Sequence, residues 1–188
     1  MSRKKIYFRA DANSEIGYGH FIRSLALAEM LREDFNCTFF TTSPTDYQKG
    51  EIQKVCSYIS LCAEKQFDDF LSFLHGDEIV VLDNYFYTTD NQKLIKDKGC
   101  ILVCIDDMHD KFYLADLIIN QGLGYSKKDY LCANYTKFAL GHKYILLRKP
   151  FFEASKKNRD YRQLDSYHIL VAFGGSDPLN LTNKAINA

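Results

Sequence analysis

Residues 6–31 read IYFRADANSEIGYGHFIRSLALAEML. The apolar run at residues 6–8 predicts a buried strand, and the apolar side chains after residue 20 recur at the three- and four-residue spacing of a helix. Between strand and helix, Gly17 and Gly19 let the backbone come close to a ligand. A strand that runs through a glycine loop into a helix presents free backbone N–H groups at the edge of a sheet, where anions and sugar phosphates bind.

His20 stands at the entrance of this predicted helix. An imidazole at this position supplies a group that takes up or releases a proton near neutral pH. The residues alone leave two interpretations open: a catalytic histidine that faces a ligand, or a histidine that caps the helix or lies on the surface. Arg23 follows one helical turn later, where it either brings a positive charge to a phosphate or remains an exposed helix arginine.

Short apolar runs recur along the chain, with helical stretches between them. Continuous apolar runs of this length indicate strands covered on both faces, which is typical of a parallel sheet with helices on each side. We therefore predict a Rossmann-like, doubly wound α/β fold. The expected strands are residues 6–8, 37–40, 59–61, 79–82, 101–105, 117–119 and 169–173, and the expected helices are residues 20–33, 67–74 and 89–98.

The composition predicts three regions: an N-terminal domain at residues 1–150, a linker at residues 151–166 and the beginning of a second α/β domain at residues 167–188. The charged residues of the linker, including the basic run at residues 148–162, fit a solvated segment, with a phosphate-binding patch as the alternative. In the third region a strand, the turn Gly174-Gly175 and Pro178 repeat the order of strand, glycine turn and helix start. We expect this second domain only to begin within the chain.

The charge and cysteine content exclude several classes of protein. The formal net charge is zero, so no overall field favours nucleic acid or an anionic membrane. The N-terminus is neither a signal peptide nor a membrane span. Six cysteines without a Cys-x-x-Cys pair predict reduced thiols in a cytoplasmic protein, and we expect Cys100 and Cys104 to pack in the core rather than bind a metal. Because Ile22 occupies the third position of Gly-x-Gly-x-x-Gly, no complete dinucleotide fingerprint is present either.

Polar residues follow several of the predicted strands, and in an open parallel sheet ligands bind beyond the carboxyl ends of the strands. We expect these residues to meet at one edge, although Asp83 and Tyr85 could instead cap the strand end. Asp106 and Asp107 suggest a metal pair, but adjacent strand residues point to opposite faces, so loop capping is the favoured interpretation. The strand-end residues are Asp11, His20, Asp83, Tyr85, Asp106, Asp107 and Asn120.

Six motifs occur in the same order as in one known family, at residues 9–23, 80–85, 105–107, 117–121, 141–151 and 173–177. They resemble motifs of the nucleotide-sugar hydrolases of the pseudaminic acid pathway, the UDP-2,4-diacetamido-2,4,6-trideoxy-β-L-altropyranose hydrolases, which are related to MurG-like GT-B glycosyltransferases. The N-terminal motif is also shared by spore-coat polysaccharide proteins. The resemblance covers nearly all of this chain but only the first part of the family's two-domain enzyme.

This resemblance implies a GT-B fold whose N-terminal domain binds the sugar and whose C-terminal domain binds the nucleotide. It implies that His20 acts as a general base, so that water attacks the anomeric carbon and expels UDP with inversion, with no metal or other cofactor. The protein would be a cytoplasmic monomer whose partner is a UDP-sugar, without nucleic acid or membrane insertion, and its product would supply a bacterial surface glycan.

The motif positions also imply a set of site residues. His20 is the catalytic residue. The residues expected to contact the sugar substrate are Arg9, Asp11, Gly17, Tyr18, Gly19, Arg23, Asp83, Tyr85, Asn120 and Arg148. The residues expected to hold the diphosphate are Gly174, Gly175 and Ser176.

Two other functions remain open at this point. A MurG-like glycosyltransferase would use the same loop but transfer the sugar to an acceptor, and a non-catalytic fragment would bind a sugar nucleotide without turnover. Because most uridine contacts of a GT-B protein lie in the second domain, we expect the isolated chain to bind UDP weakly and to hydrolyse the nucleotide sugar negligibly.

Overall fold

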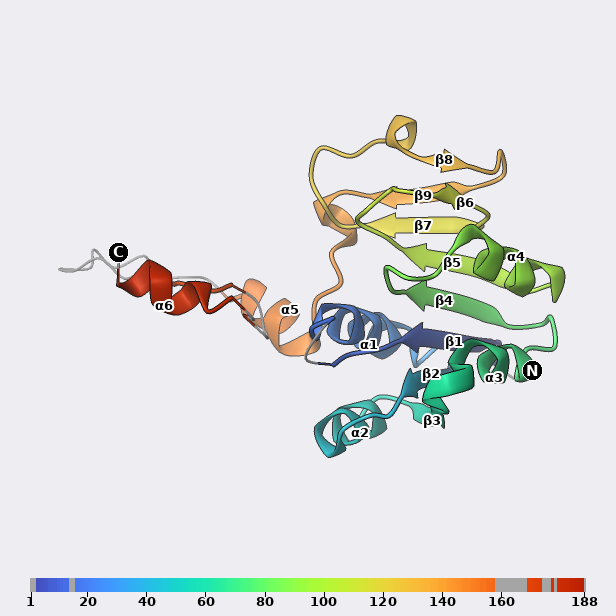
Figure 1. Cartoon of the computed structure of the whole chain (residues 1–188), viewed down its shortest axis with the longest axis horizontal. Coiled ribbons are helices and arrows are strands. Elements are labelled where there is room, and N and C mark those ends of the chain that lie inside the picture. Colours follow the sequence, from blue (N-terminus) through green and yellow to red (C-terminus); the bar gives the residue numbers. More distant parts are fainter. Residues whose placement is uncertain (1–2, 14–15, 158–168, 174–176, 178, 188) are drawn as a thin grey trace.

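The computed structural model describes residues 3–13, 16–157, 169–173, 177 and 179–187. Its centre is a seven-stranded sheet in which every pairing is parallel, in the order β3-β2-β1-β4-β5-β7-β9. The strand arrows of β1, β4, β5 and β7 point to the same side in Figure 1. These strands are β1 Lys5–Ala10, β2 Asn36–Thr42, β3 Ser57–Leu61, β4 Ile79–Asp83, β5 Ile101–Ile105, β7 Leu117–Asn120 and β9 Lys137–Leu140.

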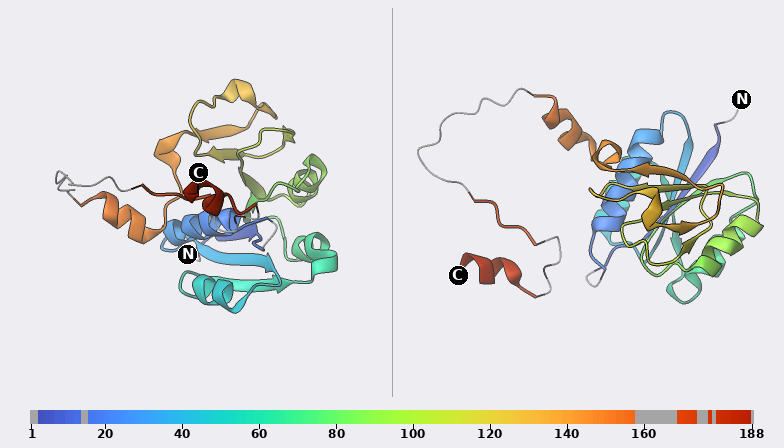
Figure 2. Two further views of the ribbon diagram at one scale, coloured as in Figure 1. Left: turned by 60° about the vertical axis from the view of Figure 1, so that its left-hand side comes forward. Right: turned by 90° about the horizontal axis from the view of Figure 1, so that it is seen from above.

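Helices cover both faces of the sheet, as Figure 2 shows for α1 and α4. The remaining elements are α1 Gly19–Leu31, α2 Asp46–Gln53, η1 Ala63–Lys65, α3 Gln66–Ser72, α4 Thr89–Asp97, η2 Lys127–Asp129, η3 His142–Tyr144, α5 Lys149–Ser155, α6 Leu181–Ile186 and the small parallel pair β6 Phe112–Tyr113 with β8 Leu131–Cys132. The predicted Rossmann-like α/β fold is therefore confirmed.

Alternation along the strands divides the core into two layers. Phe8 and Val81 pack with Phe21 of α1 on one face, whereas Val80 packs with Ile95 of α4 on the other. Successive side chains of a strand point to opposite faces, and fully burying each large apolar side chain stabilises the fold by about 1.5–3 kcal/mol. In β4 this alternation places Asp83 on the same face as Val81, toward α1.

The strand order reverses at β1, because β2 follows on one side and β4 lies on the other. In doubly wound sheets the crevice at such a switch point is where ligands bind. Ala10, the last residue of β1, pairs in register with Asp83, the last residue of β4. The loop between β1 and α1 therefore begins beside the carboxylate of Asp83.

Six of the seven expected strands and all three expected helices are present, with ends shifted by up to a few residues. Several elements were not predicted, among them α2 and β9. The helix α2 is polar and contains Gly50, so it lacks an apolar pattern, although the capping box of Thr45 and Gln48 is a signal for its start. The strand β9 is short.

The expected strand at residues 169–173 is not formed. Its described residues have no strand assignment, and the side chains of Ile169 and Leu170 are 85% and 92% exposed. A strand needs neighbouring strands to pair with, and none lies beside this segment in the described part of the chain. The proposed division into two domains stays a prediction.

Candidate functional site

The candidate site lies where β1 and β4 end beside the first turn of α1. In the loop after β1, the N–H of Gly17 donates to the carbonyl of Asn13 over 3.0 Å, and Gly17 has φ of 75°, a left-handed conformation that favours glycine. Tyr18 precedes α1 without a side-chain hydrogen bond to the helix, and a side chain at Gly19 would meet open space. The side chain at the N-cap position of α1, Tyr18, thus accepts no hydrogen bond from the backbone N–H groups of the first turn.

His20 and Asp83 form a buried pair at this point. Nδ1 of His20 lies 2.7 Å from Oδ1 of Asp83, and the two residues are 3% and 0% exposed. A carboxylate only accepts hydrogen bonds, so this distance requires the proton on Nδ1. Nε2 of His20 then carries the lone pair, and the described part of the chain offers no hydrogen-bond partner for it. The short contact with Asp83 thus favours the Nδ1–H tautomer of His20, which is the form that a general base needs.

Arg23 joins the same carboxylate through two hydrogen bonds. Its Nε donates to Oδ2 of Asp83 over 2.7 Å and its Nη2 to Oδ1 over 2.6 Å, while Nη1 donates to Asp107 over 2.9 Å. Burial would lower the pKa of Arg23, but the hydrogen bonds and charges of Asp83 and Asp107 outweigh it and raise this pKa. All three nitrogens donate to carboxylates in this structure, and contact of Arg23 with a phosphate stays a prediction.

The helical spacing explains why α1 supplies three groups to Asp83. Arg23 and Ser24 follow His20 by three and four residues, so both lie on the same side of α1 as His20. The hydroxyl of Ser24 donates to Oδ2 of Asp83 over 2.9 Å. Ser24 was not among the expected site residues, although its position one turn after His20 is the signal that could have found it.

Tyr85 covers one side of the pair. Its ring meets the His20 ring edge to face, with centroids 4.3 Å apart, and Tyr85 is 48% exposed. Its hydroxyl donates to Oδ2 of Asp107 over 3.4 Å. Burial and then the negative charge of Asp107 raise the pKa of the Tyr85 hydroxyl, so it stays protonated at neutral pH. Tyr85 is the exposed member of this cluster.

The two adjacent aspartates after β5 have different roles. Asp106 accepts the N–H of His109 over 2.8 Å and the hydroxyl of Tyr113 over 2.6 Å, which is the loop capping expected of it. Asp107, for which loop capping was also favoured, instead turns toward Arg23. Because it lies in the loop beyond Ile105, the alternation of strand side chains no longer decides its direction.

Arg9 and Asp11 lie inside the fold. Arg9 is 0% exposed, its Nη1 is 2.6 Å from Oδ1 of Asp11, and its Nη2 donates to Thr42 and Gln66. Asp11 also accepts the backbone N–H of Thr42 over 2.7 Å. These bonds tie the end of β1 to β2, so in this structure Arg9 has no surface with which to contact a substrate.

Among the other expected residues, Asn120 and Arg148 lie outside the His20 cluster. Asn120 is 1% exposed, and its amide donates to the hydroxyl of Tyr130 over 2.8 Å and accepts the N–H of Gly122. Arg148 precedes α5 and stacks on Phe151, with 5.4 Å between the guanidinium carbon and the ring centroid. The expected diphosphate residues Gly174, Gly175 and Ser176 lie outside the described residues.

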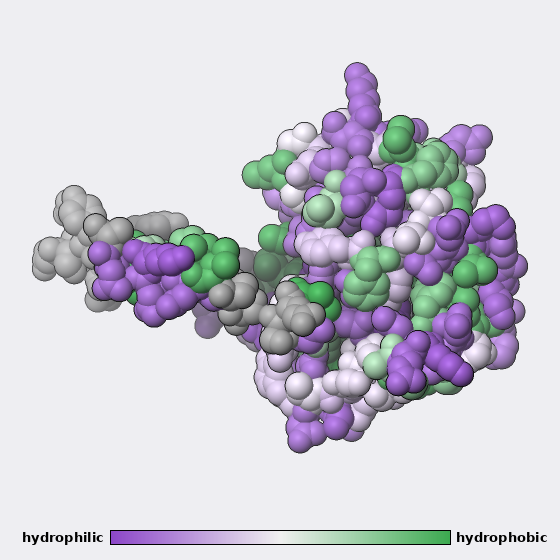
Figure 3. All heavy atoms as spheres, viewed as in Figure 1, coloured by the Kyte–Doolittle hydropathy of each residue, from purple (hydrophilic) through white to green (hydrophobic). Residues whose placement is uncertain are grey.

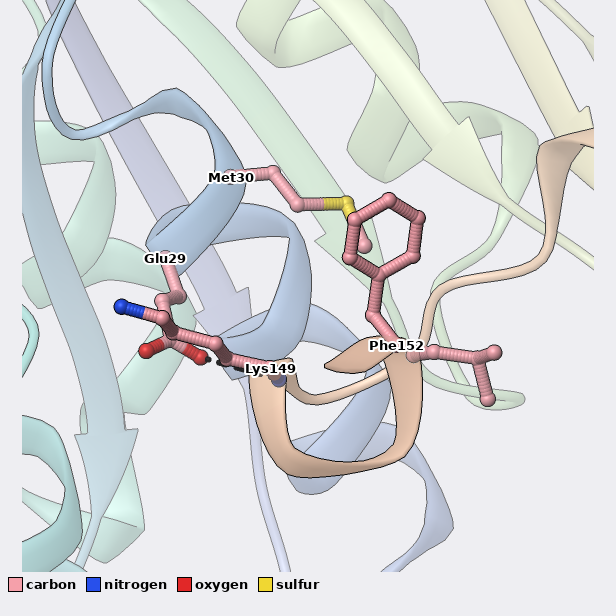
Figure 4. A pocket seen from close by; sticks show the side chains of 5 residues that line it. Glu29, Met30, Lys149 and Phe152 are labelled. Atoms are coloured by element: carbon pink, nitrogen blue, oxygen red, sulfur yellow. Dashed lines mark hydrogen bonds between the residues drawn. The ribbon is translucent and has the colours of Figure 1, made fainter. Parts of the chain in front are cut away.

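An apolar pocket of about 260 Å³ lies at the other end of α1. Figure 4 shows Met30, in the last turn of α1, beside the ring of Phe152 from α5, and Glu29 and Lys149 lie at its margin. The backbone N–H of Lys149 donates to Oε2 of Glu29 over 3.4 Å. This pocket is remote from His20, because about ten helical residues separate its lining on α1 from His20.

The described residues were also compared with what a disulfide, a metal site or a membrane span would need. All six cysteines are free, and burial raises the pKa of Cys37 to about 11 and that of Cys56 to about 12. Within the described ranges, no three His, Cys, Asp or Glu side chains are grouped to hold a metal ion. Among the described helices, none is both long and apolar enough to cross a membrane. On the face shown in Figure 3, polar and apolar side chains of the main body are interspersed.

The fold and the cluster together define a Rossmann-like α/β domain with a candidate catalytic histidine at its switch point. No protein-family model matches the chain. It is 29% identical over 187 residues to the UDP-2,4-diacetamido-2,4,6-trideoxy-beta-L-altropyranose hydrolase of Campylobacter jejuni, which covers 95% of this chain and 63% of that protein.

Two other curated proteins are similar. The chain is 26% identical over 190 residues to the spore coat polysaccharide biosynthesis protein SpsG of Bacillus subtilis, covering 95% of this chain and 53% of that protein. It is 31% identical over 194 residues to an uncharacterised protein of Methanocaldococcus jannaschii, covering 97% of this chain and 39% of that protein. The chain thus spans between 39% and 63% of the length of these relatives. These similarities support the resemblance to proteins of sugar-nucleotide chemistry that the motifs indicate.

Proposed function

We propose that this chain forms the catalytic part of a nucleotide-sugar hydrolase in which His20 activates water. The observation that carries the proposal is the buried His20–Asp83 pair beside the glycine loop, which leaves Nε2 of His20 as a lone-pair base. The similarity to the Campylobacter jejuni hydrolase supports this activity. The proposed substrate is a UDP-linked 2,4-diacetamido-2,4,6-trideoxy hexose.

In the proposed reaction, Nε2 of His20 takes a proton from water as the water oxygen attacks the anomeric carbon. The bond between that carbon and the diphosphate oxygen breaks, and its electron pair leaves with UDP. Attack from the face opposite the leaving group inverts the configuration of the sugar. A positioned general base contributes about 10²–10⁴-fold, and the rest of the barrier reduction must come from stabilising charge on the ring and the leaving diphosphate.

The residues around His20 suggest how a substrate would lie. Tyr85, whose ring meets that of His20, and Tyr18 of the glycine loop are accessible aromatic side chains, and we assign them to the sugar. Gly17 and Gly19 allow close approach of the anionic group to the uncapped start of α1. Asp83 and Arg23 act on His20 and not on the sugar. Arg9 and Asp11 support the loop from inside the fold, while Asn120 and Arg148 remain proposed contacts of a larger substrate.

The finer parts of the proposal follow the family resemblance. We propose that Gly174, Gly175 and Ser176 bind the diphosphate, that no metal or redox cofactor takes part, and that the protein acts as a cytoplasmic monomer without nucleic acid. The free sugar would enter pseudaminic acid synthesis for a bacterial surface glycan. A relation to MurG-like proteins with a GT-B arrangement belongs to the same proposal.

Product analysis tests the activity. The protein at its full natural length is incubated with the UDP-diacetamido sugar and no acceptor, and release of UDP and free sugar is followed by anion-exchange chromatography. We expect equimolar UDP and sugar, and an inverted anomer in proton NMR spectra recorded before mutarotation. Release of UDP only after addition of a sugar or lipid acceptor would refute hydrolysis.

Such acceptor dependence would establish the second candidate function, a glycosyltransferase. One observation favours keeping it: the similar Bacillus subtilis protein is named for polysaccharide biosynthesis. The His20–Asp83 pair suits both reactions, because a base that deprotonates water can also deprotonate an acceptor hydroxyl.

A further inference from the structure

Nδ1 of His20 lies between an acceptor and a donor. Oδ1 of Asp83 is 2.7 Å away and accepts a proton carried by Nδ1, whereas Nη2 of Arg23 is 3.1 Å away and can only donate. These two contacts favour opposite tautomers. If Arg23 turned its N–H toward Nδ1, the ring proton would move to Nε2, and His20 would lose the lone pair that faces the site.

Asp107 holds Arg23 away from that arrangement. The guanidinium is fixed at one end by Asp83, through Nε and Nη2, and at the other by Oδ2 of Asp107, which accepts Nη1 over 2.9 Å. The side chain of Arg23 is only 12% exposed, so little water is available to replace a lost partner. Anchored at both ends, the planar guanidinium keeps its paired donors on Asp83.

We propose that Asp107 is a positioning residue that keeps His20 in its Nδ1–H tautomer by holding Arg23 on Asp83. The expected effect on catalysis rests on the proposed function, whereas the expected effect on the tautomer of His20 does not. Asp107 has no hydrogen bond to His20 and acts through Arg23. Two carboxylates against one guanidinium also leave one negative charge in the cluster, which balances the imidazolium that forms when His20 takes a proton.

The tautomer can be measured without substrate. Nitrogen-15 NMR of the histidine rings distinguishes a protonated from an unprotonated ring nitrogen, and His20 is assigned by comparison with the His20→Asn variant. We expect Nδ1–H for the wild type and a substantial Nε2–H fraction for Asp107→Ala. The matched control is Asp110→Ala, which removes a half-exposed carboxylate of the same loop that pairs only with Lys111 among the described residues. An unchanged Nδ1–H spectrum in Asp107→Ala overturns the proposal.

Kinetics give an independent test in the full-length protein. We expect Asp107→Ala to lower kcat by about 10–100-fold, the range typical of partners that orient a functional group, with KM changed by less than about twofold. Asp107→Asn should have a smaller effect because its amide oxygen still accepts from Nη1. Equal kcat for wild type and Asp107→Ala overturns the proposal, whereas absence of hydrolysis in the wild type refutes only the proposed function.

Folding of the variants is checked by circular dichroism and thermal unfolding. The side chain of Asp107 is 37% exposed and lies in a loop, so a folded Ala variant is expected. Should Asp107→Ala be unfolded, Asp107→Leu, which keeps the bulk of the side chain but cannot accept from Nη1, carries the same NMR test, and a wild-type spectrum for it together with unchanged kcat overturns the proposal.

Discussion

Two buried carboxylates lie at opposite ends of β4, and their partners differ. Asp83 ends the strand and is bonded by side chains of α1, whereas Glu78 precedes the strand and accepts backbone N–H groups of His75 and Gly76, each over 3.0 Å. Both residues are 0% exposed. Nζ of Lys5 also lies 3.5 Å from Oε1 of Glu78, but the shorter hydrogen bonds of Glu78 come from the backbone. A carboxylate satisfied mainly by backbone N–H groups fixes a turn, while one satisfied by titratable side chains orients groups that can react.

The comparison predicts that the two ends of β4 respond differently to substitution. Changes around Asp83 should alter turnover more than stability, and changes at Glu78 should alter stability more than turnover. Measurements of both quantities on the same variants therefore test the assignment of the site directly.

The largest effect is expected for His20. We predict that His20→Asn lowers kcat by about 10²-fold or more, because the group acts in the transition state, with little change in KM. Steady-state kinetics of the full-length protein measure this, and His75→Asn is the control because His75 takes part in the Glu78 turn only through its backbone N–H. A His20→Asn variant with nearly normal kcat would remove His20 from the mechanism.

A smaller but still large effect is expected for Asp83→Asn. An amide can present its NH₂ group to Nδ1, which favours the wrong tautomer of His20, and it no longer balances the charge of Arg23. We predict a loss of about 10²-fold in kcat that is not additive with His20→Asn, since both remove one function. Additive losses in the double variant would show that Asp83 does not act through His20.

Glu78→Gln should reduce stability and leave kcat nearly unchanged. Burial would raise the pKa of Glu78, but the backbone hydrogen bonds outweigh it and lower the pKa to about 2. Stability from this group is therefore complete above the unfolded value near 4.5 and is lost as the pH falls toward 2. We predict a loss of about 1.5–3 kcal/mol at pH 7, the usual contribution of hydrogen bonds to a charged group.

Urea unfolding at pH 7 and pH 3 measures this contribution. The difference between wild type and Glu78→Gln should shrink at pH 3, because Glu78 of the unfolded wild-type chain is then mostly protonated while the folded carboxylate is still mostly ionised. A difference that is the same at both pH values would contradict the lowered pKa.

The smallest effect is expected from removal of metal ions. We predict that EDTA leaves the activity within about twofold of the untreated enzyme, because the proposed chemistry uses an imidazole base and not a metal-bound water. Activity that is lost in EDTA and restored by a divalent ion would contradict this part of the proposal. Buffer exchange with EDTA followed by back-titration of Mg²⁺ and Mn²⁺ is the measurement.

The fold could be predicted well from the sequence because most of its strands are continuous apolar runs. Residues 79–82 and 101–105 are continuous apolar runs, and buried parallel strands have that pattern. Polar α2 lacks such a pattern, so only its capping box indicated it. The run at residues 169–173 has the strand pattern but no neighbouring strand in the described residues, which shows that pattern alone does not provide a partner.

The site was only partly predictable from sequence. His20, Asp83 and Tyr85 were expected to meet because parallel strand ends share one edge, and the structure brings them together. The local sequence could not show that Arg23 would be bonded by Asp83, 60 positions away, and by Asp107, 84 positions away. Burial of Arg9 was equally hidden, because a charged residue at a strand end resembles a ligand contact until the surrounding chain is placed.

The pairing of β1 with β4 also has a consequence for the order of folding events. The His20–Asp83 contact joins residues 63 positions apart, so it forms only after the chain has closed a loop that contains most of α1 together with β2, α2, β3 and α3. Closing such a loop costs conformational entropy before any contact repays it, and contacts of long sequence separation slow folding. We therefore expect the histidine signal of His20 to reach its native value late in refolding, together with the central strand pair and after local helix formation.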